Sequence, residues 1–238
     1  MFRSVVAAAA VAAVGTAASA SSIELRFLGT GAYQNVRISD SSLGINDYQV
    51  GAGEIRFRVI STDLASYDAG DVIITFCTDI GQTVQPTNTN HMFDVVAAAA
   101  APNPGQAMGA DRARLLSHLY ATSLAGVVDA VSAAGFQLAV WEIVNEAGFD
   151  AAAGSFAASG LDVHAGDFRA LNQTAARNAA NAFLQAAFAG YLDPQARGAA
   201  IAAAVSGQYQ DQIVLVPIPA AGSLAGAGLL ALGLRRRR

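Results

Sequence analysis

The first third of the chain alternates apolar and polar residues with the period of a half-buried β-strand. In residues 23–27 and 55–59 apolar side chains alternate with charged ones, and residues 72–76 form a more continuously apolar run. Clusters of Gly, Asn, Asp and Ser separate these segments and are typical of turns. We therefore expect residues 22–85 to form an antiparallel β half, built as a sandwich or as a barrel-like sheet.

After this region the hydrophobic period becomes helical, once past loop-like stretches at 86–90 and 101–109. The predicted elements are a helix capped by Asp111, helices over 133–146 and 167–189, a fourth helix opened by Asp193-Pro194 and ending near Gly207, and a strand over 213–216. The helical half would span residues 110–206. Packed on the β half, it gives an α+β fold.

Residues 1–20 have the three parts of a cleavable secretion signal. Arg3 gives a charged start, residues 5–14 are an unbroken apolar run, and Ala18-Ser19-Ala20 supplies the small-x-small pattern that precedes cleavage. A buried N-terminal helix is the alternative, but it would not explain small residues at these positions. The sequence predicts export, with a mature chain that starts at or near Ser21.

The C-terminal end also has three parts. They are a stiff extended segment of Val216, Pro217, Ile218 and Pro219, an uncharged segment over 220–234, and a closing cluster of Arg235, Arg236, Arg237 and Arg238. The uncharged segment is shorter than the roughly 17 residues that a stable membrane span needs, so it suits a transient stop. The arginine cluster would stay on the cytoplasmic side of the membrane.

This tail resembles the VPLPA form of the PEP-CTERM sorting signal, with Ile218 where leucine is the commonest residue. The resemblance covers residues 216–238 alone. It implies processing by an exosortase-type membrane protease, loss of the terminal arginines after transient membrane insertion, and delivery to the cell surface or extracellular space of a Gram-negative bacterium. It indicates where the protein goes and is silent on what the protein does.

Composition narrows the function of the segment between the two ends, which is roughly 200 residues long and sufficient for one core. Hydrophobic residues make up 53% of the chain, but many are alanine, so the capacity to build a core is lower than that figure suggests. The net charge of −4 argues against nucleic-acid binding. All 14 basic residues are arginine, which excludes an isopeptide cross-link made through lysine.

Cys77 is the single cysteine, and it falls at the end of a predicted strand. In an exported protein an unpaired thiol calls for a reason, either a buried position or a dedicated reaction. Gln137 lies in a predicted helix that is apolar on nearly every side. Burying its amide without partners would cost roughly 2 kcal/mol or more, although backbone partners would satisfy it.

Taken together, the two segments resemble the paired motifs of bacterial Cys–Gln thioester domains. Phe76-Cys77-Thr78-Asp79 supplies the first motif, and a Gln-x-x-x-Trp-Glu run beginning at Gln137 supplies the second. The resemblance implies that residues 21–210 form a thioester-like extracellular domain. In that family the cysteine sulfur attacks the glutamine side-chain carbonyl, ammonia leaves, and the thioester captures a surface nucleophile in adhesion or biofilm matrix attachment.

Such a protein needs no cofactor or metal and is not an enzyme beyond forming its own bond. Phe76, Phe136 and Trp141 are candidates for a hydrophobic shell that excludes water from the thioester. His91 and His118 are candidate proton acceptors during nucleophilic attack. The nucleophile itself, hydroxyl or amine, stays open. We expect Cys77 and Gln137 to be neighbours where the β half meets the helical half.

Three other functions compete with this hypothesis. A cysteine hydrolase would need an imidazole beside Cys77, and no histidine motif accompanies it. A metal site is disfavoured because one cysteine and three scattered histidines show no ligand spacing. The serious rival is a non-reactive structural or matrix surface protein that keeps the same scaffold and a free Cys77.

Overall fold

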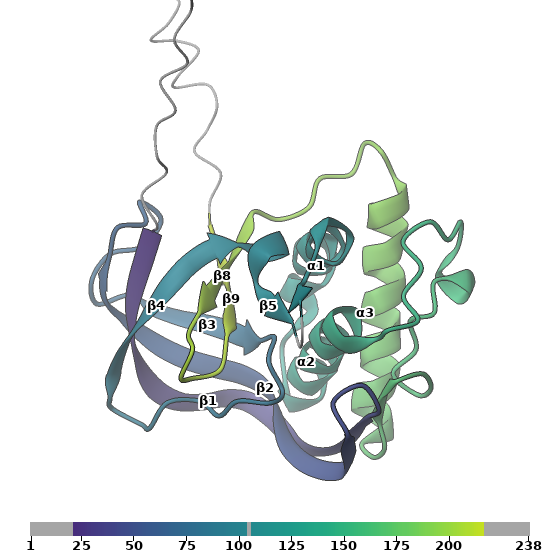
Figure 1. The fold of residues 1–238 in the computed structure, drawn as a ribbon, viewed down its shortest axis with the longest axis horizontal. Coiled ribbons are helices and arrows are strands. Elements are labelled where there is room, and N and C mark those ends of the chain that lie inside the picture. Colours follow the sequence, from purple (N-terminus) through teal and green to yellow (C-terminus); the bar gives the residue numbers. More distant parts are fainter. Residues whose placement is uncertain (1–20, 104–105, 217–238) are drawn as a thin grey trace, which may run out of the picture.

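The structure is a computed structural model that describes residues 21–103 and 106–216 (Figure 1). It is mixed α+β, with an antiparallel sheet beside a layer of helices, as the sequence predicts. The predicted secretion signal over 1–20 lies outside the described residues. So do Pro217, Ile218, Pro219 and the cluster from Arg235 to Arg238. Within the described ranges, no helix combines the length and hydrophobicity needed to cross a membrane.

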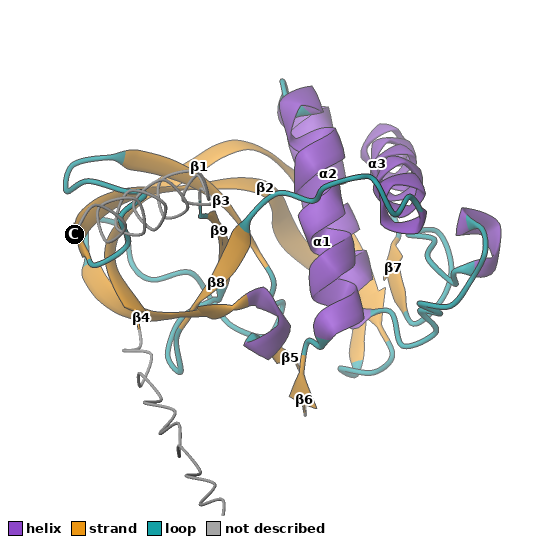
Figure 2. Ribbon diagram, turned by 90° about the horizontal axis from the view of Figure 1, so that it is seen from above, coloured by secondary structure: helices purple, strands orange, loops and turns teal. Residues whose placement is uncertain are grey.

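One seven-stranded antiparallel sheet forms the β part of the molecule. Its strands are β1 (Ser21–Asp40), β2 (Ile45–Thr62), β3 (Val72–Cys77), β4 (Asn90–Ala97), β7 (Phe168–Ala170), β8 (Ile201–Val205) and β9 (Gln212–Leu215). They follow the order β2-β3-β9-β8-β4-β1-β7, and β1 also pairs with β2. That second pairing closes six strands into a ring, so the barrel-like arrangement is the one observed (Figure 2).

The alternating pattern of the first strands places one face of each strand inside the barrel. Ile23 and Leu25 of β1 are fully buried, and Phe57 of β2 lies inside with them, whereas Arg56 and Arg58 are exposed. The Phe57 ring meets Phe93 of β4 edge-on, with centroids 6.4 Å apart. The barrel therefore has an aromatic and aliphatic core of its own.

Three helices cover one side of the barrel: α1 (Ala110–Ser123), α2 (Ala130–Asn145) and α3 (Thr174–Leu192) (Figure 2). Helix α2 contacts β1, β2 and β3 on one side and both other helices on the other. Every residue from Ala133 to Asn145 is consequently buried, which explains a helix that is apolar on nearly every side. Asp129 caps its start in a reciprocal capping box with Ser132.

The remaining elements are short. They are the single-turn 3₁₀ helices η1 (Ala98–Ala100), η2 (Leu124–Gly126) and η3 (Phe156–Ala158), and a two-stranded ribbon of β5 (Pro102–Asn103) and β6 (Gln106–Ala107). Two sequence expectations differ in detail here. The residues at 101–109 were expected to be loop and contain this ribbon, and Asp111 lies in the first turn of α1, whose N-cap is Gly109.

The predicted division at residues 22–85 and 110–206 is wrong in its boundaries, because the sheet also takes strands from later in the chain. Strand β4 lies between the two predicted halves and was missed. The helix expected over 167–189 begins only at Thr174. Before it, β7 pairs with the end of β1 as an added strand.

The fourth predicted helix, opened by Asp193-Pro194, does not form. The N–H of Ala199 instead donates to the carbonyl of Ser117 at 2.9 Å, and the alanine-rich segment that follows forms β8. Strand β8 pairs with β4 on one side and β9 on the other. Alanine favours a helix intrinsically, but here two sets of interstrand hydrogen bonds override that preference.

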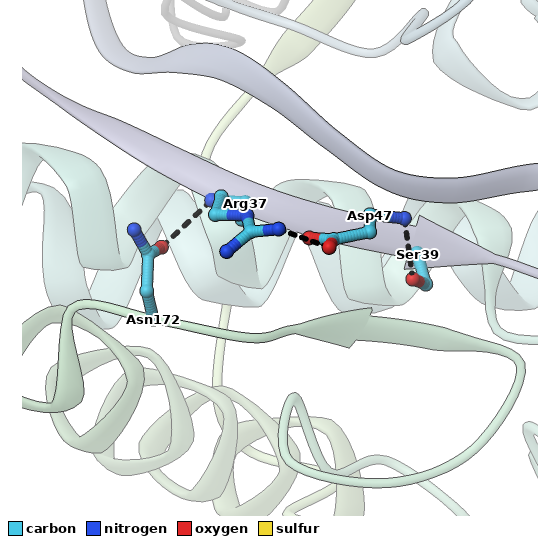
Figure 3. Close-up of polar contacts among 4 residues, drawn as sticks. All are labelled: Arg37, Ser39, Asp47 and Asn172. Atoms are coloured by element: carbon cyan, nitrogen blue, oxygen red, sulfur yellow. Dashed lines mark hydrogen bonds and ion pairs between the residues drawn. The ribbon is translucent and has the colours of Figure 1, made fainter.

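Beyond the barrel, β1 and β2 continue as a long hairpin that is held in place by polar contacts (Figure 3). The Arg37 guanidinium pairs with the Asp47 carboxylate. The backbone N–H of Arg37 donates to Asn172 at 2.7 Å, and that of Asp47 donates to the Ser39 hydroxyl at 2.9 Å. The first and third contacts join the two strands of the hairpin, and the contact with Asn172 ties the hairpin to the segment between β7 and α3.

Close contact between α2 and α3 depends on Gly135. A Cβ at this position would lie 2.8 Å from the Ala179 Cβ and 2.9 Å from the Ala176 carbonyl oxygen. Both distances are shorter than side chains tolerate, and one of the atoms is backbone. The two helices can approach this closely because residue 135 has no side chain.

We predict that Gly135→Ala destabilises the protein although alanine favours helix. Separating α2 from α3 should lower the unfolding free energy by about 1–3 kcal/mol, partly offset by up to about 1 kcal/mol of helix propensity. Chemical denaturation measures the difference. Gly154→Ala is the matched control because nothing lies within 4 Å of its added Cβ. Equal stability of the two variants would contradict close packing at Gly135.

Candidate functional site

Cys77 and Gln137 meet where the barrel contacts the helical layer. Cys77 is the last residue of β3, opposite Gln212 of β9, and is 2% exposed. Gln137 lies in the buried middle of α2 and is 0% exposed. The sequence expectation that these two residues are neighbours is confirmed by the contacts between them.

The carboxamide of Gln137 pairs with the main chain of Cys77 in both directions. Gln137 Oε1 accepts from the Cys77 N–H at 3.0 Å, and Gln137 Nε2 donates to the Cys77 carbonyl at 2.8 Å. The Cys77 Sγ lies 3.6 Å from Gln137 Oε1. The thiol is thus adjacent to the amide, and the buried polar groups of Gln137 are satisfied.

Aromatic residues next to the pair in sequence pack on one another between the barrel and the helices. The Phe76 and Phe136 rings lie with centroids 4.6 Å apart, and Tyr120 of α1 meets both rings edge-on. Trp141 packs edge-on against Phe168 of β7, with centroids 6.3 Å apart. The three residues expected to form the hydrophobic shell are all buried, Trp141 lines the cleft together with the pair, and Tyr120 packs with Phe76 and Phe136.

Burial controls the acidity of the thiol. Removal from water raises the pKa of Cys77 well above its ordinary value, and the nearby Asp79 carboxylate raises it further. The Trp141 indole lowers the pKa of Cys77, opposing the effect of burial. At neutral pH the thiol is therefore protonated.

A cleft of about 720 Å³ reaches the pair from the other side. Cys77, Gln137 and Trp141 are its most buried lining residues, and the hairpin of β1 and β2 contributes the outer wall through Tyr33 and Tyr48, both exposed. Residues 80–84, which follow β3, line it as well. A small molecule or a protruding side chain has a route from solvent toward the thiol.

Glu54 is a functional candidate that the sequence pattern did not reveal. Among the described residues lining the cleft it is the one carboxylate, and no His, Arg or Lys accompanies it. Its Oε2 accepts from the Ala32 N–H at 2.9 Å where the β1–β2 register shifts. A glutamate at an irregular strand position carries no recognisable motif, so only the folded structure reveals its proximity to the cleft.

The structure does not bring either candidate histidine to the thiol. His91 lies on β4, contacts the Ser206 hydroxyl at 2.8 Å and meets Tyr209 edge-on. His118 lies on α1 near Tyr191 of α3. Burial lowers the pKa of both rings, and neither lines the cleft. Neither histidine is therefore placed at the Cys77–Gln137 pair.

Other sequence candidates lie away from the site. Val216 follows β9, where its N–H donates to the Ala200 carbonyl at 2.9 Å. Within the described part of the chain, no group of three or more His, Cys, Asp or Glu side chains could hold a metal ion.

Comparison with known proteins gives no relative: no family model, curated protein or solved structure matches this chain.

Asp211 is a buried residue with a carboxyl group, and it lies beside Thr78, the residue that follows Cys77. Its carbonyl accepts from the N–H of Thr78, and its Oδ1 accepts from the Ser206 N–H at 2.7 Å. Burial raises the pKa of Asp211 to about 6, and the negative charge of Asp79 adds to the increase. Ionisation of Asp211 near neutral pH therefore acts against folding.

We predict that Asp211→Asn changes how stability depends on pH. Because the folded-state pKa is raised, this group's stabilisation is complete below its unfolded pKa of about 3.9 and is lost as pH rises through about 6. Asparagine keeps an oxygen for the Ser206 N–H and cannot ionise. The melting temperature of the variant minus that of the wild type should therefore increase as the pH rises from 4 to 7.5. A difference that is constant across this range would contradict the prediction.

Proposed function

We propose that this chain is an exported surface or matrix protein whose Cys77 and Gln137 form an internal thioester for covalent attachment to a nucleophile. The observation that carries the proposal is the pairing of the Gln137 carboxamide with the main chain of Cys77, which holds Sγ 3.6 Å from Oε1. A reactive pair must be held close before the reaction begins. The cleft supports the second step because it gives an external nucleophile access.

Bond formation balances within the site. The sulfur attacks Cδ of Gln137, the thiol proton is transferred to Nε2, the C–N bond breaks, and ammonia leaves. The Cys77 N–H already donates to Oε1 and would stabilise the negative charge that develops on this oxygen. This step uses no cofactor, and the chain acts once on itself, so the protein is not a turnover enzyme.

Capture is a second acyl transfer, in which the acyl group of residue 137 passes from the sulfur to the nucleophile. A hydroxyl or amine entering through the cleft attacks Cδ, the C–S bond breaks, and the target becomes attached to residue 137 as an ester or amide. The thiol of Cys77 is regenerated. Since a thioester is far more electrophilic than an amide, contact with a target becomes a covalent bond.

Glu54 is the group best suited to take the proton from the nucleophile. It is the single carboxylate among the described lining residues, and the hydrogen bond to Ala32 holds one of its oxygens in place. A positioned base contributes because the attacking hydroxyl or amine must lose a proton as it bonds to Cδ. Glu54 thus replaces His91 and His118 as the candidate proton acceptor during nucleophilic attack.

The two ends of the sequence supply the cellular setting of the proposal. The signal-like segment over 1–20 supports export, and the resemblance of residues 216–238 to a sorting tail supports handling by an exosortase-type protease and release at the cell surface or into the matrix. The target and the biological process follow from neither end.

One observation favours the alternative of a non-reactive scaffold protein. Gln137 already makes two hydrogen bonds to the main chain, which is what a purely structural buried glutamine requires. The raised pKa of the Cys77 thiol likewise suits an inert buried cysteine. Mass measurement separates the two functions.

We predict that the freshly purified mature protein, kept free of amines, has an intact mass lower by one ammonia than the mass calculated from its sequence. Methylamine should then raise the measured mass by one methylamine, because it adds to residue 137, and should free the thiol. Cys77→Ser should abolish both changes while preserving the fold, because serine nearly keeps the shape of cysteine.

Gln49→Ala is the matched control, since Gln49 lines the cleft but is exposed and distant in sequence from both motifs. It should behave as the wild type does. Peptide mapping distinguishes the failures: a glutamate at 137 shows a thioester that formed and hydrolysed, whereas an unchanged glutamine with a free thiol would establish the non-reactive alternative.

We predict that Glu54→Gln slows methylamine capture at neutral pH by about 10-fold or more, within the range typical of losing a general base. The fraction of chains carrying the thioester should stay unchanged, because glutamine keeps an oxygen for the Ala32 N–H. Rates come from mass spectra taken over time. Glu24→Gln, on β1 outside the cleft, is the control, and equal rates for the two variants would remove Glu54 from the mechanism.

A further inference from the structure

Trp141 occupies a distinctive place beside the Cys77–Gln137 pair. It follows Gln137 by four positions on α2, and residues four apart lie on the same face of a helix. It is 1% exposed, and it lines the same cleft as Cys77 and Gln137. The sequence suggested a shielding role for the ring, but the ring also carries a polar group.

The indole N–H of Trp141 is buried without a hydrogen-bond partner among the described residues. A buried donor left unpaired costs about 1–3 kcal/mol, so native proteins seldom leave one idle without a reason. The ring edge contact with Phe168 offers this N–H no acceptor. This unpaired donor belongs to a residue that lines the same cleft as Cys77 and Gln137.

The Cys77 sulfur is the acceptor that lies nearest at hand for this N–H in the cleft. Trp141 and Cys77 are both buried and line the same cleft. In agreement with this placement, the indole acts as a hydrogen-bonding side chain that lowers the pKa of the Cys77 thiol, against the larger effect of burial. A neutral thiol is a weak acceptor, which explains why no hydrogen bond of normal geometry is present in the resting state. A thiolate is a strong acceptor, and a charged partner strengthens such a bond.

We propose that Trp141 acts as a hydrogen-bond donor to the Cys77 sulfur, stabilising the negative charge that this atom carries during thioester formation and again during capture. This role rests on the proposed thioester chemistry. In formation, charge develops as the S–H bond breaks and the S–C bond forms. In capture, the C–S bond breaks with its electron pair on sulfur, which then takes the proton released by the nucleophile.

The physical advantage lies in the difference between the two states of the sulfur. Apolar surroundings protect the thioester from water, yet the same surroundings make the departing thiolate costly. A donor that makes no hydrogen bond to the neutral sulfur but bonds to the charged one lowers the barrier without stabilising the resting state. Trp141 would therefore speed both chemical steps.

The single tryptophan of the chain makes a precise atomic substitution feasible. Growth of a tryptophan auxotroph on β-(3-benzothienyl)alanine replaces this one residue with an analogue of nearly the same shape that has sulfur in place of the N–H. Methylamine capture by the analogue protein should slow by about 10-fold or more, given that loss of one positioned donor typically costs 10²–10³ in rate. Trp141→Phe provides the genetic counterpart.

Ser66→Ala is the matched control, because it removes another buried and unpartnered polar atom, from a residue that does not line the cleft. It should leave the capture rate within about 2-fold of wild type, as expected for a group outside the site. An analogue protein that captures methylamine at the wild-type rate would overturn the role of Trp141.

A wild-type chain that keeps both its full mass and an unchanged Gln137 would contradict the proposed thioester instead. The role of Trp141 is then tested on the free thiol. Alkylation of Cys77 by iodoacetamide at pH 9 proceeds through the thiolate, so the analogue should react several-fold more slowly than wild type. Equal alkylation rates would overturn the inference independently of the thioester.

Discussion

The pairing of one buried carboxamide with the end of one strand is the constraint on which the rest of the structure depends. Helix α2 is apolar on nearly every side, so it can lie only between the barrel and the other helices. Gln137 is a buried polar group that must be satisfied where α2 meets the barrel, and the main chain of Cys77 provides both partners. The docking of α2 and the end of β3 are thereby fixed against each other, which also fixes the sulfur beside the amide.

Closure of the barrel explains why the contact between Cys77 and Gln137 is shielded from solvent on one side and accessible on the other. Strand β9 lies between β3 and β8 and covers one edge of Cys77, while the aromatic rings of Phe76, Phe136 and Tyr120 fill the helical side. The β1–β2 hairpin continues past the barrel and forms the far wall of the cleft, where Arg37 and Asp47 hold it. Protection and access thus come from different elements and could change independently.

The sequence predicted the parts of this arrangement whose signal is local. Alternation found the first three strands, helical period found α1 and α2, and two short motifs identified Cys77 and Gln137. Interactions distant in the chain account for the failures. The alanine-rich segment 201–205 becomes a strand because β4 and β9 flank it, and Phe168 leaves its expected helix to pair with β1. The positions of Glu54 at the cleft and of Trp141 beside Cys77 depend on side chains meeting across elements, so no spacing in the sequence encodes them.

The separation of sixty positions between Cys77 and Gln137 gives the proposed bond a topological consequence. A thioester there would close a loop containing β4 and α1, restricting the unfolded chain as a disulfide does. On the chain-entropy estimate for disulfides, a loop of this length stabilises the fold by about 4 kcal/mol. Capture of a target opens the loop, so the unattached protein would be the more resistant to unfolding. Attachment would then leave a less stable molecule on its target than the form that still carries the bond.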